Sequence, residues 1–128
     1  MELLVGTYLY ESSRTGTTYL KQLGAGPALG IYQMEPATHR WLRDEFLRRV
    51  RLRTRLNPLV EGTAGKMVYD LEYATRMARL RYWFVKDALP PPGDAAALGW
   101  YYKAHYNTPA GAGSAEEWTA LYLKEGRQ

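Results

Sequence analysis

Two short stretches of the chain hold the residue types that acid–base chemistry on a polar substrate requires. Glu11 closes an apolar segment near the N-terminus, and Gln33 lies about one loop later in the glycine-hinged stretch 30–33. A carboxylic acid kept protonated by a dry environment can deliver a proton to a leaving oxygen. An amide can hold a hydroxyl or an acetamido group. We therefore expect both side chains to face a cleft, with Glu11 as the catalytic acid.

Glu11 is predicted to stand at the end of a helix over residues 1–12. The helical spacing is that of Leu3, Leu4, Tyr8 and Glu11, and Gly6 is the weak point of the pattern. The macrodipole disfavours a negative charge at a helix C-terminus. Apolar neighbours add desolvation, so we expect a raised pKa for Glu11. The alternative is an ordinary surface glutamate.

Other residues of these stretches and of a later turn are candidates for holding a substrate. Gln33 either fixes a sugar amide or hydroxyl or satisfies loop backbone. Tyr32 and Tyr106 either orient Glu11 and line a groove or pack in the core with bonded hydroxyls. Residues 12–34 contain no Asp or Glu, and the nearest second carboxylate, Glu35, is expected in the first turn of the next helix.

The middle of the chain carries two further helical patterns. From Pro36 a helix has an apolar stripe made of Trp41, Leu42, Phe46, Leu47 and Val50, and Asn57-Pro58 ends it. Asp70 is expected to cap a helix that runs through Tyr73, Met77, Leu80 and Phe84 at spacings of three and four.

The last third of the chain predicts two more helices. A proline run at 90–92 interrupts helical structure. Asp94 is expected to cap a helix that reaches about His105, and an irregular segment is expected over 106–113. Ser114 to Glu117 is a capping box for a terminal helix with Trp118, Leu121 and Tyr122 inward. The chain is therefore predicted to be one all-α domain over residues 1–128 with little or no β-structure.

Composition limits the classes of function. Cysteine is absent, and His39 and His105 lack metal-ligand spacing, so we expect no metal and no cofactor. No apolar run approaches the ~18 residues that cross a bilayer. The formal charge of +4 favours a polyanionic partner. A content of 11 Tyr and 4 Trp against 2 Phe suits a groove for sugar rings as well as a core edge.

The helix from Pro36 is rich in arginine. Its members are Arg40, Arg43, Arg48, Arg49, Arg51, Arg53 and Arg55. One interpretation is a phosphate-tracking patch for nucleic acid or an anionic wall polymer. The other, which we favour, is a solvated helix face partly paired with Asp44 and Glu45.

Several separated segments follow the pattern of one known family in the right order. They are Glu11-Ser12, then Ala28, Gly30, Ile31, Gln33, Pro36 and Thr38, and finally Tyr106-Asn107. Between the last two, Asp70-Leu71-Glu72-Tyr73-Ala74 is similar to a further family segment. Over nearly the whole chain this set resembles the soluble lytic transglycosylase and goose-type lysozyme branch of the lysozyme-like superfamily, especially its small phage-encoded members.

The resemblance implies a lysozyme-like fold with a substrate groove and Glu11 as the single catalytic acid. We expect substrate-binding roles for Ser12, Gly30, Tyr32, Gln33, Tyr73, Tyr106 and Asn107, with Tyr106 reaching towards the acid. The expected reaction cleaves the β-1,4 bond between N-acetylmuramic acid and N-acetylglucosamine in peptidoglycan, by the lytic transglycosylase or the lysozyme route. Relatives normally carry another helix before the acid, so the chain is expected to lack an N-terminal helix.

The same resemblance sets the expected partner and place of action. The partner is the peptidoglycan glycan strand rather than nucleic acid, and the protein is expected to act as a monomer. Synthesis is expected in the cytoplasm of a phage host, with action on the bacterial cell wall, either as an endolysin or as part of a virion.

Departures from the family pattern leave other classes of function open. Ala74 stands where a glycine is usual, Thr108-Pro109 replaces the usual Ala-Gly, and Gly24 sits near a usual serine. A catalytically idle phage structural or peptidoglycan-binding module that retains the fold fits these departures. A small helical nucleic-acid binder built on the arginine-rich helix ranks last, because it leaves the segment 30–38 unexplained.

Overall fold

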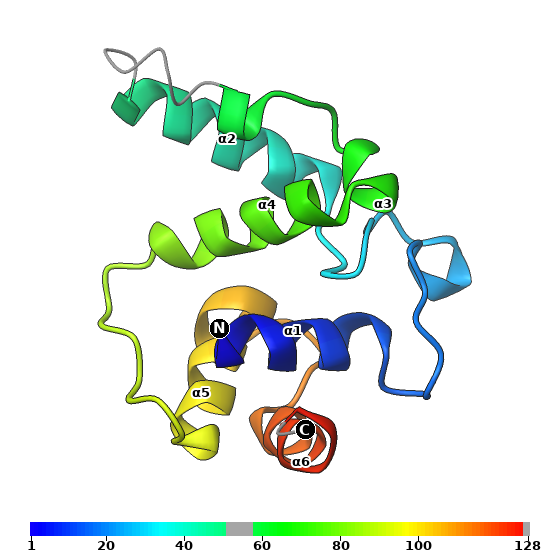
Figure 1. The fold of residues 1–128 in the computed structure, drawn as a ribbon, viewed down its shortest axis with the longest axis vertical. Helices are drawn as coiled ribbons and strands as arrows, with labels where there is room; N and C mark the ends of the chain where they lie inside the picture. The colour runs from blue at the N-terminus through cyan, green and yellow to red at the C-terminus, as the bar shows by residue number, and fades with distance from the viewer. Residues whose placement is uncertain (51–57, 127–128) are drawn as a thin grey trace. The chain divides into compact units, whose positions relative to one another are not determined.

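A computed structural model of the protein describes residues 1–50 and 58–126. In this described part the chain is all-α, as predicted, with six α-helices and two isolated β-bridges. The helices are α1 (Glu2–Ser12), α2 (Pro36–Val50), α3 (Lys66–Tyr69), α4 (Leu71–Trp83), α5 (Ala95–Tyr102) and α6 (Ala115–Glu125) (Figure 1). A short 3-10 turn, η1 (Leu23–Ala25), and a π-helical turn, η3 (Lys103–Asn107), complete them.

The chain divides into two compact units. Unit 1 comprises Met1–Thr18 and Arg81–Gln128, and unit 2 comprises Tyr19–Leu80. The boundary falls inside α4, after Leu80. The assignment of residues 1–128 to one catalytic domain stays a prediction.

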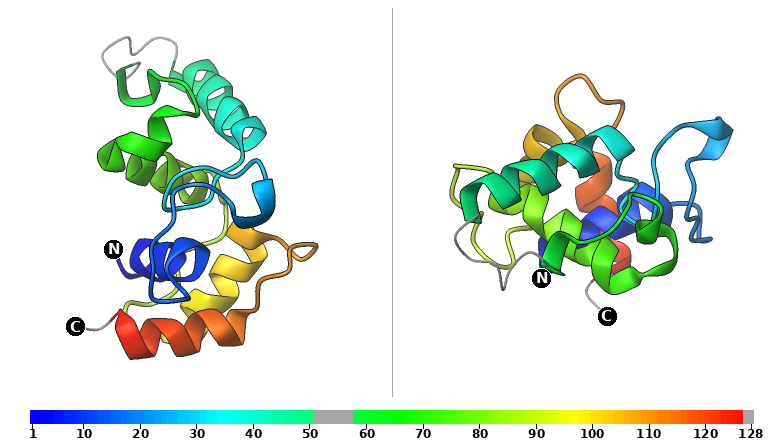
Figure 2. Two further views of the ribbon diagram at one scale, coloured as in Figure 1. Left: turned by 90° about the vertical axis from the view of Figure 1, so that its right-hand side faces the viewer. Right: turned by 90° about the horizontal axis from the view of Figure 1, so that it is seen from above.

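Unit 1 is built from α1, α5 and α6, which lie against one another (Figure 2). All three helices contact the buried side chain of Trp118 or carry it. The fully buried Trp118 ring stacks on Tyr102 of α5 and on Tyr122 of its own helix, with ring centroids 6.0 and 5.3 Å apart. Gly6 of α1 lies so close to the indole that an added β-carbon would collide with it. Gly6, expected to be a weak point of the helix, is therefore what allows α1 to approach α6 this closely.

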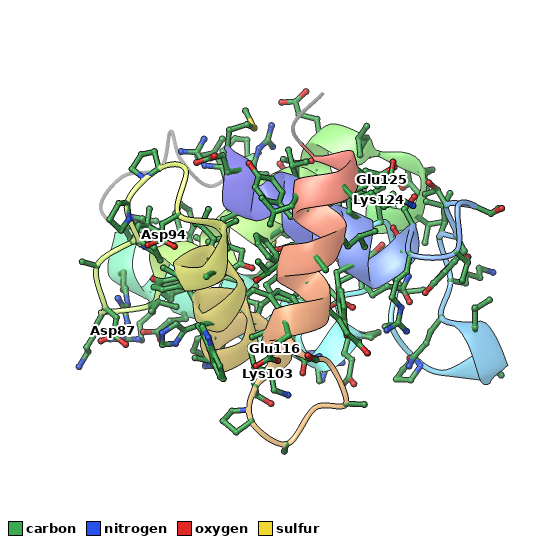
Figure 3. The ribbon with its side chains drawn as sticks, turned by 90° about the horizontal axis from the view of Figure 1, so that it is seen from below. Asp87, Asp94, Lys103, Glu116, Lys124 and Glu125 are labelled. Carbon is green, nitrogen blue, oxygen red and sulfur yellow. The ribbon has the colours of Figure 1, made fainter. Side chains whose placement is uncertain are left out.

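The two later helices of unit 1 begin with the predicted side-chain caps. Asp94, at the start of α5 (Figure 3), accepts the N–H of Ala97 at 3.0 Å, and Ser114 accepts the N–H of Glu117 at 3.2 Å. The second contact of the α6 capping box, from Glu117 to the backbone N–H of Ser114, runs through the hydroxyl of Tyr10. Glu117 accepts the Tyr10 hydroxyl at 2.7 Å, and Tyr10 accepts the backbone N–H of Ser114 at 3.0 Å. The start of α6 is thus fastened to α1.

The prediction of an irregular segment from residue 106 is wrong for its first two residues. The helix continues through Tyr106 and Asn107 as the π turn η3. Lys103 (Figure 3) closes this end, because its ammonium donates to Oδ1 of Asn107 at 2.9 Å and to the carbonyls of Thr108 and Gly111 at 3.0 and 2.7 Å. The ammonium therefore ties the loop that follows the helix to the side chain of the helix's last residue.

The core of unit 2 is lined by α2 and α4. Leu42 of α2 and Met77 of α4 are fully buried. Asp70 caps α4 as predicted, accepting the N–H of Tyr73 at 2.8 Å. The helix ends at Trp83, one residue before the predicted Phe84.

One expected core position of α2 is wrong. Trp41 is 54% exposed. The helix faces the core with His39, Leu42 and Phe46, a stripe with spacings of three and four residues, and position 41 falls outside that stripe.

The arginine-rich face of α2 is paired in part where it is described. Arg48 and Arg49 contact Glu45 at 2.6 and 2.8 Å and lower the pKa of its carboxyl to about 2. Arg51, Arg53, Arg55 and the predicted stop at Asn57 lie outside the described residues. The described half therefore fits a solvated, partly paired helix face.

Candidate active site

Glu11 stands in the last turn of α1 and is held by a phenol from α5. Its Oε1 accepts the hydroxyl of Tyr102 at 2.6 Å, and its side chain is half-buried. Burial raises the pKa of Glu11, and this outweighs the Tyr102 hydrogen bond and the positive charges of Arg81 and Arg14, which lower it. The predicted direction of the shift is confirmed.

Tyr102 is the centre of an aromatic cluster in unit 1. The ring is fully buried, with Tyr10 edge-on at 5.5 Å and Tyr106 stacked at 6.0 Å between centroids. Burial raises the pKa of the Tyr102 phenol above its ordinary value, and the neighbouring Glu11 charge raises it further. Tyr102 is therefore a hydrogen-bond donor throughout the physiological range. A fixed donor on Oε1 leaves Oε2 as the oxygen of Glu11 that carries the exchangeable proton.

Tyr106, which was expected to reach towards the acid, packs against Tyr102, the residue that holds Glu11. Its buried ring stacks on Tyr102 and lies 5.3 Å from the ring of Tyr82. The guanidinium of Arg81 covers the Tyr106 ring at 4.5 Å and also donates to the Tyr106 carbonyl. Tyr102 was not among the predicted site residues, although it lies four residues before Tyr106 and so on the same helical face.

Two predicted substrate contacts of unit 1 are engaged in internal bonds. Ser12 is fully buried, and its hydroxyl donates to the carbonyl of Tyr8 at 3.3 Å. Oδ1 of Asn107 accepts from Lys103 and from the N–H of Gly113 at 3.1 Å. Both side chains therefore stabilise the backbone next to the Glu11 cluster.

The Gly30–Gln33 turn of unit 2 is tight and bonded to itself. Gly30 has a φ of +72°, and an added β-carbon would collide with the carbonyl of Met67. Gln33 adopts a φ of +46° and donates from Nε2 to the Gly30 carbonyl at 2.8 Å. The side-chain amide of Gln33 thus bonds to the loop backbone, which was the alternative to binding a substrate.

The remaining residues near this turn have structural partners in unit 2. Tyr32 is buried, and its hydroxyl lies 3.3 Å from Oγ1 of Thr75. Glu35 is exposed just before α2, and its carbonyl accepts the N–H of His39 at 3.0 Å. Glu35 was expected in the first turn of this helix and instead lies one residue before it.

Tyr73, predicted to bind substrate, is a core residue. It is 1% exposed, donates to the carbonyl of Val60 at 3.3 Å, and lies 2.8 Å from Nε2 of His39. His39 is also buried, and burial lowers the pKa of its imidazole. A direct contact between Tyr73 and a substrate therefore has no support in the structure.

No group of three or more His, Cys, Asp or Glu side chains that could hold a metal ion occurs among residues 1–50 and 58–126. Within the same ranges, no helix has the length and apolar character that crossing a membrane needs.

Comparison with known proteins gives no relative. No protein-family model matches the chain, no curated protein matches it, and no solved structure matches it.

Proposed function

We propose that this chain is a peptidoglycan-cleaving enzyme of the lytic transglycosylase or lysozyme type, with Glu11 as its single acid and base. One observation carries the proposal: a half-buried carboxyl with a raised pKa, oriented by the buried Tyr102 phenol. Such an acid remains protonated at a higher pH than an exposed glutamate, which is what proton delivery to a glycosidic oxygen requires. The order of the sequence motifs selects peptidoglycan as the substrate.

In this proposal Glu11 donates its proton to the oxygen that links two sugars. The bond from C1 to that oxygen breaks, and an oxocarbenium-like centre forms at C1. The C6 hydroxyl of the same sugar attacks C1, and Glu11 takes the hydroxyl proton back. The products are a 1,6-anhydro sugar and a free chain end. If water attacks in place of the C6 hydroxyl, the same proton steps give hydrolysis.

Tyr102 acts here as a positioning residue. Its hydroxyl holds Oε1, so the protonated oxygen of Glu11 keeps one direction. The pH dependence follows from the raised pKa, since Glu11 must be protonated to start the reaction. Activity is therefore expected to fall as the pH rises through the pKa of Glu11.

The direct experiment is release of soluble fragments from purified peptidoglycan by the wild type and by Glu11→Gln. The matched control is Glu2→Gln at the opposite end of α1, because Glu2 also accepts a tyrosine hydroxyl, from Tyr122 at 2.9 Å. We expect Glu11→Gln to lower turnover by roughly 10²–10⁴-fold and Glu2→Gln to leave it unchanged. Turnover near the wild-type rate in Glu11→Gln would show that another group is the acid.

Mass spectrometry of the fragments separates the two reaction types. Anhydro ends identify attack by the C6 hydroxyl, and reducing ends identify attack by water. Either product fits the proposed acid. Failure to release product from every peptidoglycan preparation tested would exclude the enzyme proposal.

A wall-binding module without turnover is the second candidate. It is favoured by the internal bonds of Ser12, Asn107 and Tyr73, three residues expected to touch substrate. This candidate predicts that the wild type sediments with peptidoglycan, releases no fragments, and binds as well as Glu11→Gln.

A further inference from the structure

Two arginines flank the aromatic cluster that holds Glu11. The guanidinium of Arg81 lies 4.5 Å from the ring centroid of Tyr106, and that of Arg14 lies 4.9 Å from the ring centroid of Tyr10. Both tyrosines pack on the Tyr102 ring. Both cations are near enough to act electrostatically on Glu11.

These two guanidiniums differ from three arginines on the helix faces of unit 2 that form ion pairs with carboxylates. Arg48, Arg49 and Arg76 each have a carboxylate partner, at distances of 2.5 to 2.8 Å. Neither Arg81 nor Arg14 has a carboxylate within ion-pair distance in the part of the chain that the structure describes. Their positive charge next to Glu11 is therefore not neutralised by a side chain described here.

For a catalytic acid this arrangement is unfavourable by itself. A nearby cation stabilises the carboxylate form and so reduces the protonated fraction. An anion bound to the cations would cancel that effect. Arg81 has the geometry to bind one, because its face rests on Tyr106 and one nitrogen is held by the Tyr106 carbonyl, which fixes the plane of the fork. A fixed guanidinium fork matches the two oxygens of a carboxylate.

We propose that Arg81, with Arg14 as a second charge, forms a carboxylate-binding subsite beside Glu11 that selects acidic glycans. The inference rests on the proposed function, and it adds the class of substrate: glycan strands with carboxylate substituents, such as the peptide stems of peptidoglycan, over neutral chitin-like strands. Binding of the substrate carboxylate neutralises Arg81 and thereby favours the protonated form of Glu11 in the complex.

The test compares two forms of one substrate. Peptidoglycan strands are used either native or with their carboxylates converted to neutral amides by carbodiimide coupling to ethanolamine. We expect kcat/KM of the wild type to be at least about tenfold lower on the amidated strands, the range expected for losing a hydrogen bond to a charged group. This measurement needs no variant, so it remains informative if a substitution disturbs folding.

Variants then assign the effect to Arg81. Arg81→Met should lose about tenfold in kcat/KM on native strands and little on amidated strands. Arg79→Met, an exposed arginine on the same helix, removes the same charge and should change neither value. Equal losses for Arg81→Met on both substrates would overturn the subsite in favour of a purely structural role, as would equal wild-type rates on both.

A binding measurement separates this inference from the proposed reaction. Glu11→Gln should sediment with native strands more strongly than with amidated strands, and Arg81→Met added to it should remove the difference. If the wild type cleaves nothing, the reaction is wrong while the sedimentation result still decides the subsite. If sedimentation shows no difference between native and amidated strands, the subsite is wrong while the reaction stands on its own products.

Discussion

Glu11 in unit 1 and His39 in unit 2 are each held by a tyrosine hydroxyl, and burial shifts both pKa values towards the neutral form. The pKa of Glu11 is raised and that of His39 is lowered. The Glu11 side chain is half-buried and holds one phenol, whereas His39 is 3% exposed and pairs with a tyrosine that is itself buried. Desolvation alone therefore does not identify a catalytic group. The group must also remain accessible to a substrate.

The largest expected difference is between substitutions of the two titratable residues. Glu11→Gln should lower kcat by roughly 10²–10⁴-fold, the usual contribution of a general acid. His39→Gln should leave kcat unchanged and lower the free energy of unfolding by about 1–3 kcal/mol, because a buried hydrogen bond to Tyr73 is disturbed. Fragment release and urea unfolding measure the two quantities. A catalytic loss in a folded His39→Gln variant would break the comparison.

The next effect concerns two glycines, one in each unit. Gly6→Ala places a methyl against the buried Trp118, and Gly30→Ala places one against the Met67 carbonyl at a φ of +72°. Each should lower the free energy of unfolding by about 1–3 kcal/mol, the usual cost of overpacking. Gly65→Ala is the control, since its added methyl meets only Oγ1 of Thr63 at 3.7 Å. Equal unfolding midpoints for all three variants would contradict the packing.

Tyr102 and Tyr73, the tyrosines bonded to Glu11 and His39, should differ in their effect on the pH dependence of activity. The Tyr102 hydrogen bond lowers the pKa of Glu11, so Tyr102→Phe should raise that pKa and move the alkaline fall of activity to higher pH. It should also lower kcat by about tenfold through loss of orientation. Tyr73→Phe should cost about 1 kcal/mol of stability and leave the pH–rate profile unchanged. A pH profile of Tyr102→Phe identical to that of the wild type would exclude the positioning role.

The smallest effects are in the pH dependence of stability. The folded pKa of Glu11 is raised, so its stabilising contribution is fully present below about pH 4.5 and is lost as the pH rises through the raised value. The folded pKa of His39 is lowered, so its contribution is present above about pH 6.5 and is lost as the pH falls through the lowered value. Relative to the wild type, Glu11→Gln should gain stability as the pH rises and His39→Gln as it falls. Urea titrations across pH 4 to 8 check both signs.

The local elements could be predicted because they depend on neighbouring residues. The caps at Asp70, Asp94 and Ser114 need only a side-chain oxygen and a backbone N–H three residues later. The all-α class follows from apolar spacing in the same way. Trp41 shows the limit, because the boundary of an apolar stripe depends on what the helix packs against.

The candidate site could be predicted only in part. Glu11 and its raised pKa followed from its place at a helix end with apolar neighbours. The contacts of Tyr102 with Glu11 and of Arg81 with Tyr106 could not be predicted, since they join residues far apart in the chain. The sequence left two roles for the Gln33 amide, binding a substrate or bonding to the loop backbone. In the structure Gln33 has a left-handed backbone, and its amide donates to the carbonyl of Gly30 in the same turn.

The sequence by itself determined that the chain is helical, where most of its helices begin, and that its first acidic residue after Glu2 ends a helix beside apolar residues. Only the tertiary structure decided which tyrosine holds that acid and which polar residues are engaged elsewhere. The physical reason is that helix formation is governed by interactions within about one turn. The proton affinity of a side chain is instead set by burial and by charges that folding brings from distant positions.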